Sequence, residues 1–333
     1  MKALALRNFA PAAALAVALG AFGWAGAANA QQEIKIGYAL APTSHYGVAA
    51  DKWQEVVEAK SDGRYKFRHF PSSGLGGERE VIEGLQLGTI EATIVSSGTL
   101  SNFVPETGIF DIPFLFRDLT HARKVLDGEV GQSILAKFDD VGLVALAWGE
   151  QGFRHITNNR NEIDKPEDVA GLKLRTMENP IHITAFETLG AAPTPMAWPE
   201  VISALQQGTI DGQENPLSVI TSAKLSEVQK YLTLSGHVYS PAMLLVSKQL
   251  WEGMSPEDQT IFKDAATEAV AAMRAYVDNV ETSGVEQLKK EGMNVSEMTA
   301  EQKAAFQKAL APAYEKYYGQ YDKATIDKII ATE

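Results

Sequence analysis

Two kinds of hydrophobic pattern alternate along the chain. Apolar and polar residues alternate one by one over residues 33–40 (EIKIGYAL) and 65–70 (YKFRHF), which is the two-residue period of a β-strand. Residues 48–63 and about 78–87 instead carry apolar residues at helical spacing, and the first of these segments ends at Gly63, a typical helix stop. Strands that alternate with helices in this way predict an α/β sheet with parallel pairs.

One stretch of sequence occurs twice. Residues 85–92 (LQLGTIEA) and 205–212 (LQQGTIDG) share a helix end, a glycine, Thr-Ile and an acidic residue. Chance is the alternative explanation, because helix–glycine–strand junctions are common in α/β proteins. We favour the interpretation that each of two lobes contains an equivalent strand entered by the same turn, with a cleft between the lobes.

A long helix is predicted in the last third of the chain. Ser255 has the character of an N-cap, Pro256 follows at the first helical position, and acidic residues occupy the first turn. The helical pattern then continues to Gly292. A helix of about 35 residues is about 50 Å long, so it can cross both lobes.

The first thirty residues have the order of a secretory signal peptide. Lys2 and Arg7 precede an apolar segment rich in small residues, and residues 28–30 (ANA) form an A-x-A cleavage site. A membrane anchor is the alternative, but Pro11 and the many alanines and glycines disfavour it. No later segment has the ~18 uninterrupted apolar residues of a spanning helix. We therefore expect export, cleavage after residue 30, and a soluble protein in a bacterial periplasm.

Length and charge narrow the class of protein further. Removal of residues 1–30 leaves 303 residues, more than the ~250–300 at which one core usually divides, so two lobes are expected. The remaining 28 basic and 42 acidic residues give a net charge of −14, which argues against nucleic acid or anionic lipid as a partner. The absence of cysteine excludes disulfides, thiolate metal sites and cysteine nucleophiles.

The sequence lacks the familiar catalytic and metal-binding motifs. It contains no H-E-x-x-H, G-x-S-x-G or G-x-x-x-x-G-K-[ST] motif, and its six histidines form no i, i+4 pair. The glycine-rich residues 72–80 are interpreted as a turn before a helix, and His155 and His182 as structural residues or ligand contacts. The sequence thus predicts no metal site, no cofactor and no enzyme.

Polar side chains follow the predicted strands at three places. Arg154 comes after the apolar segment 141–148, Arg175 stands at the end of a short strand in GLKLRTMENP, and residues 213–215 (QEN) follow another short strand. Ligands of open α/β sheets bind beyond the carboxyl ends of strands. Arginine offers a planar pair of donors that matches a carboxylate, and Asn215 adds an amide. Each arginine alone suggests a surface ion pair, but the three positions together predict an anion site.

One aromatic residue stands near this predicted site. Trp198 lies between two prolines at the start of a predicted helix. A cavity wall needs such a residue to pack against the carbon skeleton of a ligand. Packing in the core is an equally good explanation of the same position.

Several long motifs, in the right order, resemble the substrate-binding proteins of tripartite ATP-independent periplasmic (TRAP) transporters, the DctP type. The similarity extends through essentially the whole mature chain. The motifs occupy residues 70–92, 110–118, 152–160, 171–176, 189–217 and 227–247. The resemblance implies two α/β lobes that close on an organic acid, a long helix across both, and delivery of the acid to a membrane permease driven by an ion gradient.

The resemblance also implies roles for individual residues. The principal carboxylate-binding arginine of the family falls on Arg175, a second arginine on Arg154 and the motif asparagine on Asn215, while Trp198 replaces a usual phenylalanine. First-lobe contacts fall on the loop after the first strand and on the loop at residues 96–97, and are made when the lobes close. The predicted ligand-binding residues are Arg175, Arg154, Asn215, Trp198, Ser44, His45, Tyr46, Glu78, Ser96, Ser97 and Tyr239.

The identity of the acid stays open between a sugar acid and a C4-dicarboxylate. Ser96 and Thr99 stand where sialic-acid binders carry an acid and an arginine, which speaks against sialic acid. We expect a monomer with lobe I formed by residues 31–151 and about 240–280, and lobe II by 152–239 and about 281–333. A binding protein that serves a sensor kinase, or a periplasmic enzyme acting on an organic acid, are the alternatives.

Overall fold

The computed structural model describes residues 31–333, so the predicted signal peptide lies outside the described residues. The strands are β1 (Gln32–Tyr38), β2 (Tyr65–Phe70), β3 (Ala92–Ser96), β4 (Leu143–Asn158), β5 (Lys173–Thr176), β6 (Ala192–Pro195), β7 (Gly212–Pro216), β8 (Tyr231–Ser247) and β9 (Asn294–Glu297). The first two strands and the first two helices agree with the sequence prediction to within about three residues, the usual uncertainty of element ends.

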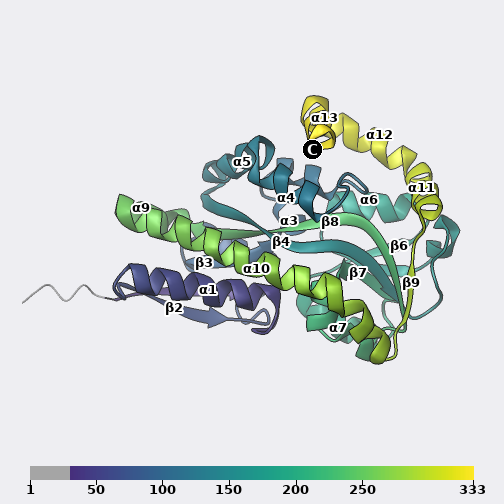
Figure 1. Cartoon of the computed structure of the whole chain (residues 1–333), viewed down its shortest axis with the longest axis horizontal. Coiled ribbons are helices and arrows are strands. Elements are labelled where there is room, and N and C mark those ends of the chain that lie inside the picture. Colours follow the sequence, from purple (N-terminus) through teal and green to yellow (C-terminus); the bar gives the residue numbers. More distant parts are fainter. Residues whose placement is uncertain (1–30) are drawn as a thin grey trace, which may run out of the picture.

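Helices cover the sheet on both faces (Figure 1). The α-helices are α1 (His45–Lys60), α2 (Glu78–Gln86), α3 (Ser97–Leu100), α4 (Leu119–Asp127), α5 (Glu129–Leu135), α6 (Pro180–Thr188), α7 (Trp198–Gln206), α8 (Leu217–Ser222), α9 (Lys248–Gly253), α10 (Pro256–Lys290), α11 (Ala300–Ala309), α12 (Ala311–Gln320) and α13 (Lys323–Ala331). The 3₁₀-helices are η1 (Pro105–Asp111), η2 (Ala136–Val141), η3 (Pro166–Val169) and η4 (Leu225–Glu227).

A single sheet joins both halves of the molecule. Its strand order is β2-β1-β3-β8-β4-β7-β5-β6, with β9 beside β8. The small outer groups pair in parallel, as predicted. The two central strands β4 and β8 are antiparallel to each other, β8 is antiparallel to β3 and β4 to β7, whereas β9 pairs with β8 in parallel. The 16-residue β4 and the 17-residue β8 extend through both groups. The two lobes are therefore built on the two ends of one pair of long strands.

The duplicated sequence marks equivalent strands, as predicted. β3 and β7 each have five fully buried residues, each pairs antiparallel with a long central strand, and each leads directly into a short helix. The turns before them contain Gly88 and Gly208 with φ of 69° and 68°. Because only glycine adopts this conformation without strain, the shared LQxGTI sequence specifies the shared turn.

β8 is apolar at successive positions because both of its faces are covered. Leu244 and Val246 pack on one side, in the core with α1 and α10, while Met243 and Leu245 pack on the other side, in the core with α2, α4 and α5. The sequence segment is therefore a continuous apolar run rather than an alternating one.

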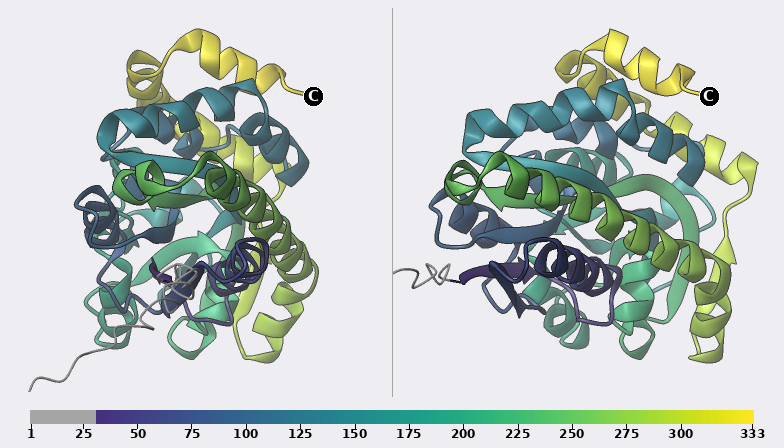
Figure 2. Two further views of the ribbon diagram at one scale, coloured as in Figure 1. Left: turned by 90° about the vertical axis from the view of Figure 1, so that its left-hand side faces the viewer. Right: turned by 60° about the vertical axis from the view of Figure 1, so that its left-hand side comes forward.

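α10 crosses both lobes, as predicted (Figures 1 and 2). Its 35 residues begin after Ser255, whose hydroxyl accepts a hydrogen bond from the amide of Asp258. The helix contacts α1 in one lobe and α8 in the other. It ends at Lys290, and Gly292 follows with φ of 99°.

β4 and β8 are irregular where the lobes meet. The register of the pair shifts between residues 145 and 147, 150 and 152, and 154 and 156. Gly152 has φ of 106°, a conformation that favours glycine. Such bulges bend a strand pair and re-aim side chains. The exact lobe boundaries stay a prediction.

The C-terminal helices contact elements of both predicted lobes. Phe306 of α11 belongs to the core that contains Val169, and α12 contacts α6, both in predicted lobe II. Leu310 and Ile329 belong to the core that contains Phe110, and α13 contacts α5, both in predicted lobe I. Figure 1 shows α13 above the α4–α5 region and α12 above α6.

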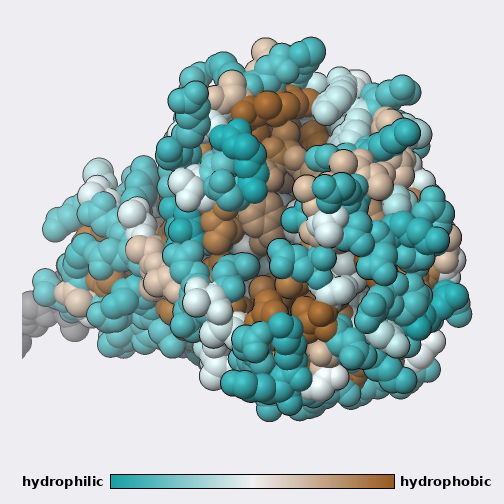
Figure 3. All heavy atoms as spheres, turned by 45° about the vertical axis from the view of Figure 1, so that its right-hand side comes forward, coloured by the Kyte–Doolittle hydropathy of each residue, from teal (hydrophilic) through white to brown (hydrophobic). Residues whose placement is uncertain are grey.

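One face of the molecule is hollowed, and apolar side chains line the hollow (Figure 3). A wide groove lies between α10, β4, β8 and α11, with Phe153, Leu234 and Val285 among its lining residues. It shares no lining residue with the pocket described below. Residues 31–333 include no helix that is long and apolar enough to cross a membrane.

Candidate functional site

A pocket lies where the ends of β3, β5 and β7 meet the start of α1. About 530 Å³ of space between its walls is not filled by protein atoms, with the solvent at its mouth included. Residues of both lobes line it: Ala39, Leu40, Tyr46, Glu78, Arg79, Ser96, Thr99, Gln151, Arg154, Arg175, Met177, Glu178, Met196, Ala197, Trp198, Asn215 and Val219.

Arg175 is a buried cation without a carboxylate partner among residues 31–333. It stands in β5 with 3% of its surface exposed. Its Nε and Nη2 atoms donate to the carbonyl oxygen of Met196 at 3.1 and 2.7 Å, and its guanidinium carbon lies 5.9 Å from the ring centre of Trp198. Burial lowers the pKa of Arg175 to about 10. The side chain is thus held at the pocket with its charge uncompensated by any contact.

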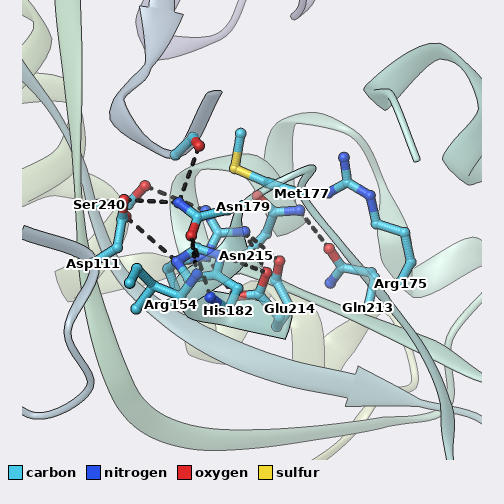
Figure 4. A network of polar contacts seen from close by, with 12 residues as sticks. Asp111, Arg154, Arg175, Met177, Asn179, His182, Gln213, Glu214, Asn215 and Ser240 are labelled. Atoms are coloured by element: carbon cyan, nitrogen blue, oxygen red, sulfur yellow. Dashed lines mark hydrogen bonds and ion pairs between the residues drawn. The ribbon is translucent and has the colours of Figure 1, made fainter. Parts of the chain in front are cut away.

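Arg154 has the opposite situation, because Glu214 already neutralises it. Its Nε and Nη2 atoms lie 2.5 and 2.8 Å from the two carboxylate oxygens of Glu214, and Nη1 donates to the hydroxyl of Ser240 at 3.2 Å. Burial opposes the charged carboxylate, but Arg154, His182 and His237 together hold the pKa of Glu214 well below its usual range. Figure 4 shows the contacts of this cluster, and none of its dashed lines reaches Arg175.

Arg154 and residues 213–215 lie inside strands and not after them, so this part of the sequence prediction is wrong. Arg154 was expected after a strand that ends at residue 148, and residues 213–215 after another strand. In the structure β4 continues to Asn158, and 213–215 lie inside β7, paired with β4. The polar residues are accommodated inside the sheet because they pair with one another: Asn215 donates to Gln213 at 2.5 Å, and Gln213 donates onward to Thr157 at 2.9 Å.

The first lobe contributes a carboxylate and hydroxyl groups. The two oxygens of Glu78, the first residue of α2, accept hydrogen bonds from the amide of Ser96 at 2.8 Å and the hydroxyl of Thr99 at 2.7 Å. The hydroxyl of Tyr46 is buried at the pocket and has no hydrogen-bond partner within residues 31–333. A ligand hydroxyl would satisfy it.

Trp198 both lines the pocket and packs in the core, the two explanations considered for it from the sequence. It is the first residue of α7 and is partly buried. Its ring lines the pocket, and it also packs against the cores that contain Val219 and Val201.

Four predicted residues do not line the pocket. Ser44 caps α1, and its hydroxyl donates to the carbonyl of Ala41 at 2.7 Å. His45 is fully buried behind Tyr46, and burial lowers its pKa to about 3. The remaining two, Ser97 and Tyr239, are also buried away from the pocket, and Tyr239 donates to a carboxylate oxygen of Glu150 at 3.0 Å.

Other lining residues were missed by the sequence analysis. Gln151 donates to the hydroxyls of Ser96 and Ser240 at 2.9 and 3.0 Å, so it connects β4 with β3 and β8 at the pocket. A polar residue inside a long apolar strand was the available signal for Gln151. Met177 and Met196 gave none, because apolar residues near a strand end are ordinary core candidates.

Contacts across the cleft hold the two lobes together around the pocket. The amide of Asn179 donates to the carbonyl of Gly98 at 3.0 Å and to Asp111 at 2.8 Å. The amide of Asn102 donates to the carbonyl of Glu178 at 2.7 Å. Segments 96–102 and 177–179 are therefore linked directly, and the cleft is closed.

The two histidines singled out in the sequence lie outside the pocket. His155 lines the wide groove, and burial lowers its pKa to about 3. His182 lies 3.3 Å from Asp111 and 3.7 Å from Glu214, as part of the buried cluster in Figure 4. Within the described part of the chain, no group of three or more acidic or histidine side chains could hold a metal ion.

Comparison with known proteins agrees with this geometry. Residues 36–320 match the family DctP, described as "Bacterial extracellular solute-binding protein, family 7". A solved TRAP periplasmic solute-binding protein from Bordetella bronchispeptica, with density interpreted as pantoate, is 60% identical, covers 91% of this chain and 100% of its own, and has a TM-score of 0.89.

Two further relatives have named ligands. A TRAP solute-binding protein from Polaromonas sp. JS666, bound to D-erythronate, is 51% identical over 91% of this chain and 99% of its own, with a TM-score of 0.89. The 2,3-diketo-L-gulonate-binding periplasmic protein YiaO of Escherichia coli is 38% identical over 84% of this chain and 85% of its own.

Proposed function

Because the chain belongs to the DctP family of bacterial extracellular solute-binding proteins, we propose that it captures an organic acid in the periplasm and delivers it to a TRAP-type membrane permease. The observation that carries the proposal is Arg175. It is a buried cation at the pocket, and no carboxylate of residues 31–333 lies within 4 Å of it. A ligand carboxylate would supply the missing anion with a two-pronged contact.

The family and the two-lobed α/β fold class predicted from the sequence are both confirmed. The family consists of solute-binding proteins. We propose that this chain likewise performs no catalysis and acts as an exported monomer. Its acidic charge agrees with a soluble ligand and disfavours nucleic acid or anionic lipid as partner.

The closed cleft explains how binding would be reported to a partner. Arg175 comes from one lobe, while Glu78 and Ser96 come from the other. A ligand that contacts both sides gains contacts only when the lobes close, so it shifts the population toward the closed form. A permease that recognises the closed form would then accept loaded protein in preference to empty protein.

The relatives support an organic acid as the class of ligand. The acids named with them are pantoate, as an interpretation of density, D-erythronate and 2,3-diketo-L-gulonate. Each is a carboxylic acid with further oxygen groups. We propose a sugar acid or related carboxylate here, with Asn215, Ser96 and Tyr46 as partners for its other oxygens.

Two other functions are less well supported. A sensor kinase could receive the closed form in place of a permease, and co-expression with a candidate permease distinguishes the two by uptake of the acid. An enzyme would convert the acid, but the pocket presents no paired nucleophile and base. Mass spectrometry of acid recovered after incubation tests this, because a binding protein returns its ligand unchanged.

A thermal-shift screen of organic acids, followed by calorimetry, tests the proposal. A ligand at 100 times its dissociation constant stabilises the protein by about 2.7 kcal/mol. Each acid that binds is compared with its own amide, which keeps the carbon skeleton and removes the charge. We expect binding of the acid and loss of binding of the amide. Equal binding of both, or no binding by any acid of the panel, would refute the role of Arg175.

A further inference from the structure

Most charges around the pocket are already paired. Arg154 is bound by both carboxylate oxygens of Glu214. At the rim, Arg79 lies 3.6 Å from Glu178, and both side chains are more than a third exposed. These two pairs leave neither a free cation nor a free anion for a ligand.

Arg175 and Glu78 are the two charges that remain. They come from opposite lobes, Arg175 from β5 and Glu78 from the start of α2, and both line the pocket. No pair of opposite charges within 4 Å includes either of them in the described residues. The pocket therefore offers a ligand one free cation on one side and one carboxylate on the other.

The position of the Glu78 carboxylate is fixed. The amide of Ser96 and the hydroxyl of Thr99 hold one oxygen each, and each oxygen keeps a second lone pair as acceptor. Burial raises the pKa of Glu78, while these two donors and the arginines act in the opposite direction. Because a backbone amide and a hydroxyl both donate to this carboxylate, the charged form of Glu78 accepts hydrogen bonds from a ligand and donates none.

We propose that Glu78 determines the class of acid: it selects monocarboxylates that carry hydroxyl groups and excludes dicarboxylates. This inference rests on the proposed function, because it takes Arg175 as the site of the first carboxylate. A ligand hydroxyl donates to Glu78. A second ligand carboxylate would be repelled by the negative charge of Glu78, and the pocket has no free cation to pair with it. Both carboxylates are also hydrogen-bond acceptors, so neither can donate to the other.

The rest of the pocket agrees with a short hydroxy acid. The buried hydroxyl of Tyr46, with no partner among the described residues, offers a second contact for a ligand hydroxyl. Leu40, Met196 and Val219 line the pocket with apolar surface, against which a carbon skeleton can pack. None of these groups can neutralise a second carboxylate.

Matched pairs of acids test the inference by calorimetry at pH 8, where a free carboxyl is ionised. Each hydroxy monocarboxylate is compared with a dicarboxylate of the same carbon number, beginning with D-erythronate and succinate. We expect the monocarboxylate of every pair that binds to be preferred by about a hundredfold or more, the size expected of a misplaced like charge.

Glu78→Gln is the decisive variant. It keeps the shape and one acceptor but removes the charge, so we expect the preference to fall at least tenfold through a gain in dicarboxylate affinity. Glu80→Gln, an exposed acid in the same helix turn, is the matched control and should leave the preference unchanged. Thermal melting of both variants checks that they fold.

The possible results separate the two proposals. Preference of the wild-type protein for a dicarboxylate, or an unchanged preference in folded Glu78→Gln, overturns the role of Glu78 and leaves the capture of organic acids intact. Failure of every acid in the panel to bind the wild-type protein overturns the proposed function itself. If Glu78→Gln does not fold, the wild-type preference still decides the inference.

Discussion

Replacing Arg175 by methionine should abolish ligand binding without destabilising the ligand-free protein. Methionine has a similar length and no charge. Because Arg175 is buried and contacts no carboxylate in residues 31–333, its charge serves the ligand rather than the fold. Arg154→Met is the matched control, since Arg154 is equally buried but bound to Glu214.

The expected magnitudes follow from these environments. Burial lowers the pKa of Arg175 from its usual value to about 10. Since one pKa unit is worth about 1.4 kcal/mol, the charge costs the folded state about 3 kcal/mol below pH 10. Methionine removes this cost but leaves the Met196 carbonyl without its donors, a loss of about 1–3 kcal/mol. The free energy of unfolding should therefore stay constant or rise by up to about 2 kcal/mol. Arg154→Met should lower it by about 3–5 kcal/mol, because the buried Glu214 carboxylate loses its guanidinium partner.

Urea unfolding of ligand-free protein and calorimetry with a bound acid measure the two effects. Bound acid must first be removed by unfolding and refolding, since it would stabilise the wild-type protein alone. We expect Arg175→Met to lose at least a hundredfold in affinity, corresponding to about 3 kcal/mol. An Arg175→Met protein as unstable as Arg154→Met, or one with wild-type affinity, would show that Arg175 supports the fold and not the ligand.

Two further predictions concern closure and pH. Gly98→Ala should lower ligand affinity about tenfold, because a Cβ atom there would lie 2.7 Å from the sulfur of Met177 across the closed cleft. The control is Gly319→Ala, where nothing lies within 4 Å of the added Cβ atom, and its affinity measured by calorimetry should be unchanged. Equal affinities of the two variants would contradict the closed geometry. Burial raises the pKa of Glu281 to about 7. Between pH 4.5 and 7 the folded protein therefore keeps a proton on Glu281 that the unfolded chain has lost. The free energy of unfolding should fall as the pH rises through this range, by about 1–2 kcal/mol after solvent screening. Glu281→Gln should flatten that part of a urea-unfolding pH profile, and an unchanged slope would refute the assignment.

Local sequence patterns predicted the elements of this fold well. The ends of the first two strands, the first two helices and α10 follow from periodicity, an N-cap and glycine stops, all of which act within a few residues. The equivalence of β3 and β7 was also visible, because the same turn needs the same glycine. Arg175 was placed at a strand end for the same local reason.

The side-chain partners in the site depend on the pairing of strands that are far apart in the sequence, which local patterns do not predict. The ion pair of Arg154 with Glu214 depends on the register of β4 against β7 and on bulges in β4. Bulges change which face a residue occupies, so alternation cannot be extrapolated along such a strand. Tyr239, in β8, consequently packs between Phe116 and Phe153 in the core instead of facing the pocket.

The two arginines of the site show how a buried charge can be made available to a ligand. A charge paired within the protein, as in Arg154 with Glu214, has little further attraction for an acid. The unpaired Arg175 keeps that attraction, at a folding cost of about 3 kcal/mol. A ligand carboxylate that pairs with Arg175 removes this cost, and the same 3 kcal/mol then appears as about a hundredfold in affinity. The large core on both faces of the sheet allows the empty protein to carry such a charge, which a smaller domain with the same pocket would tolerate poorly.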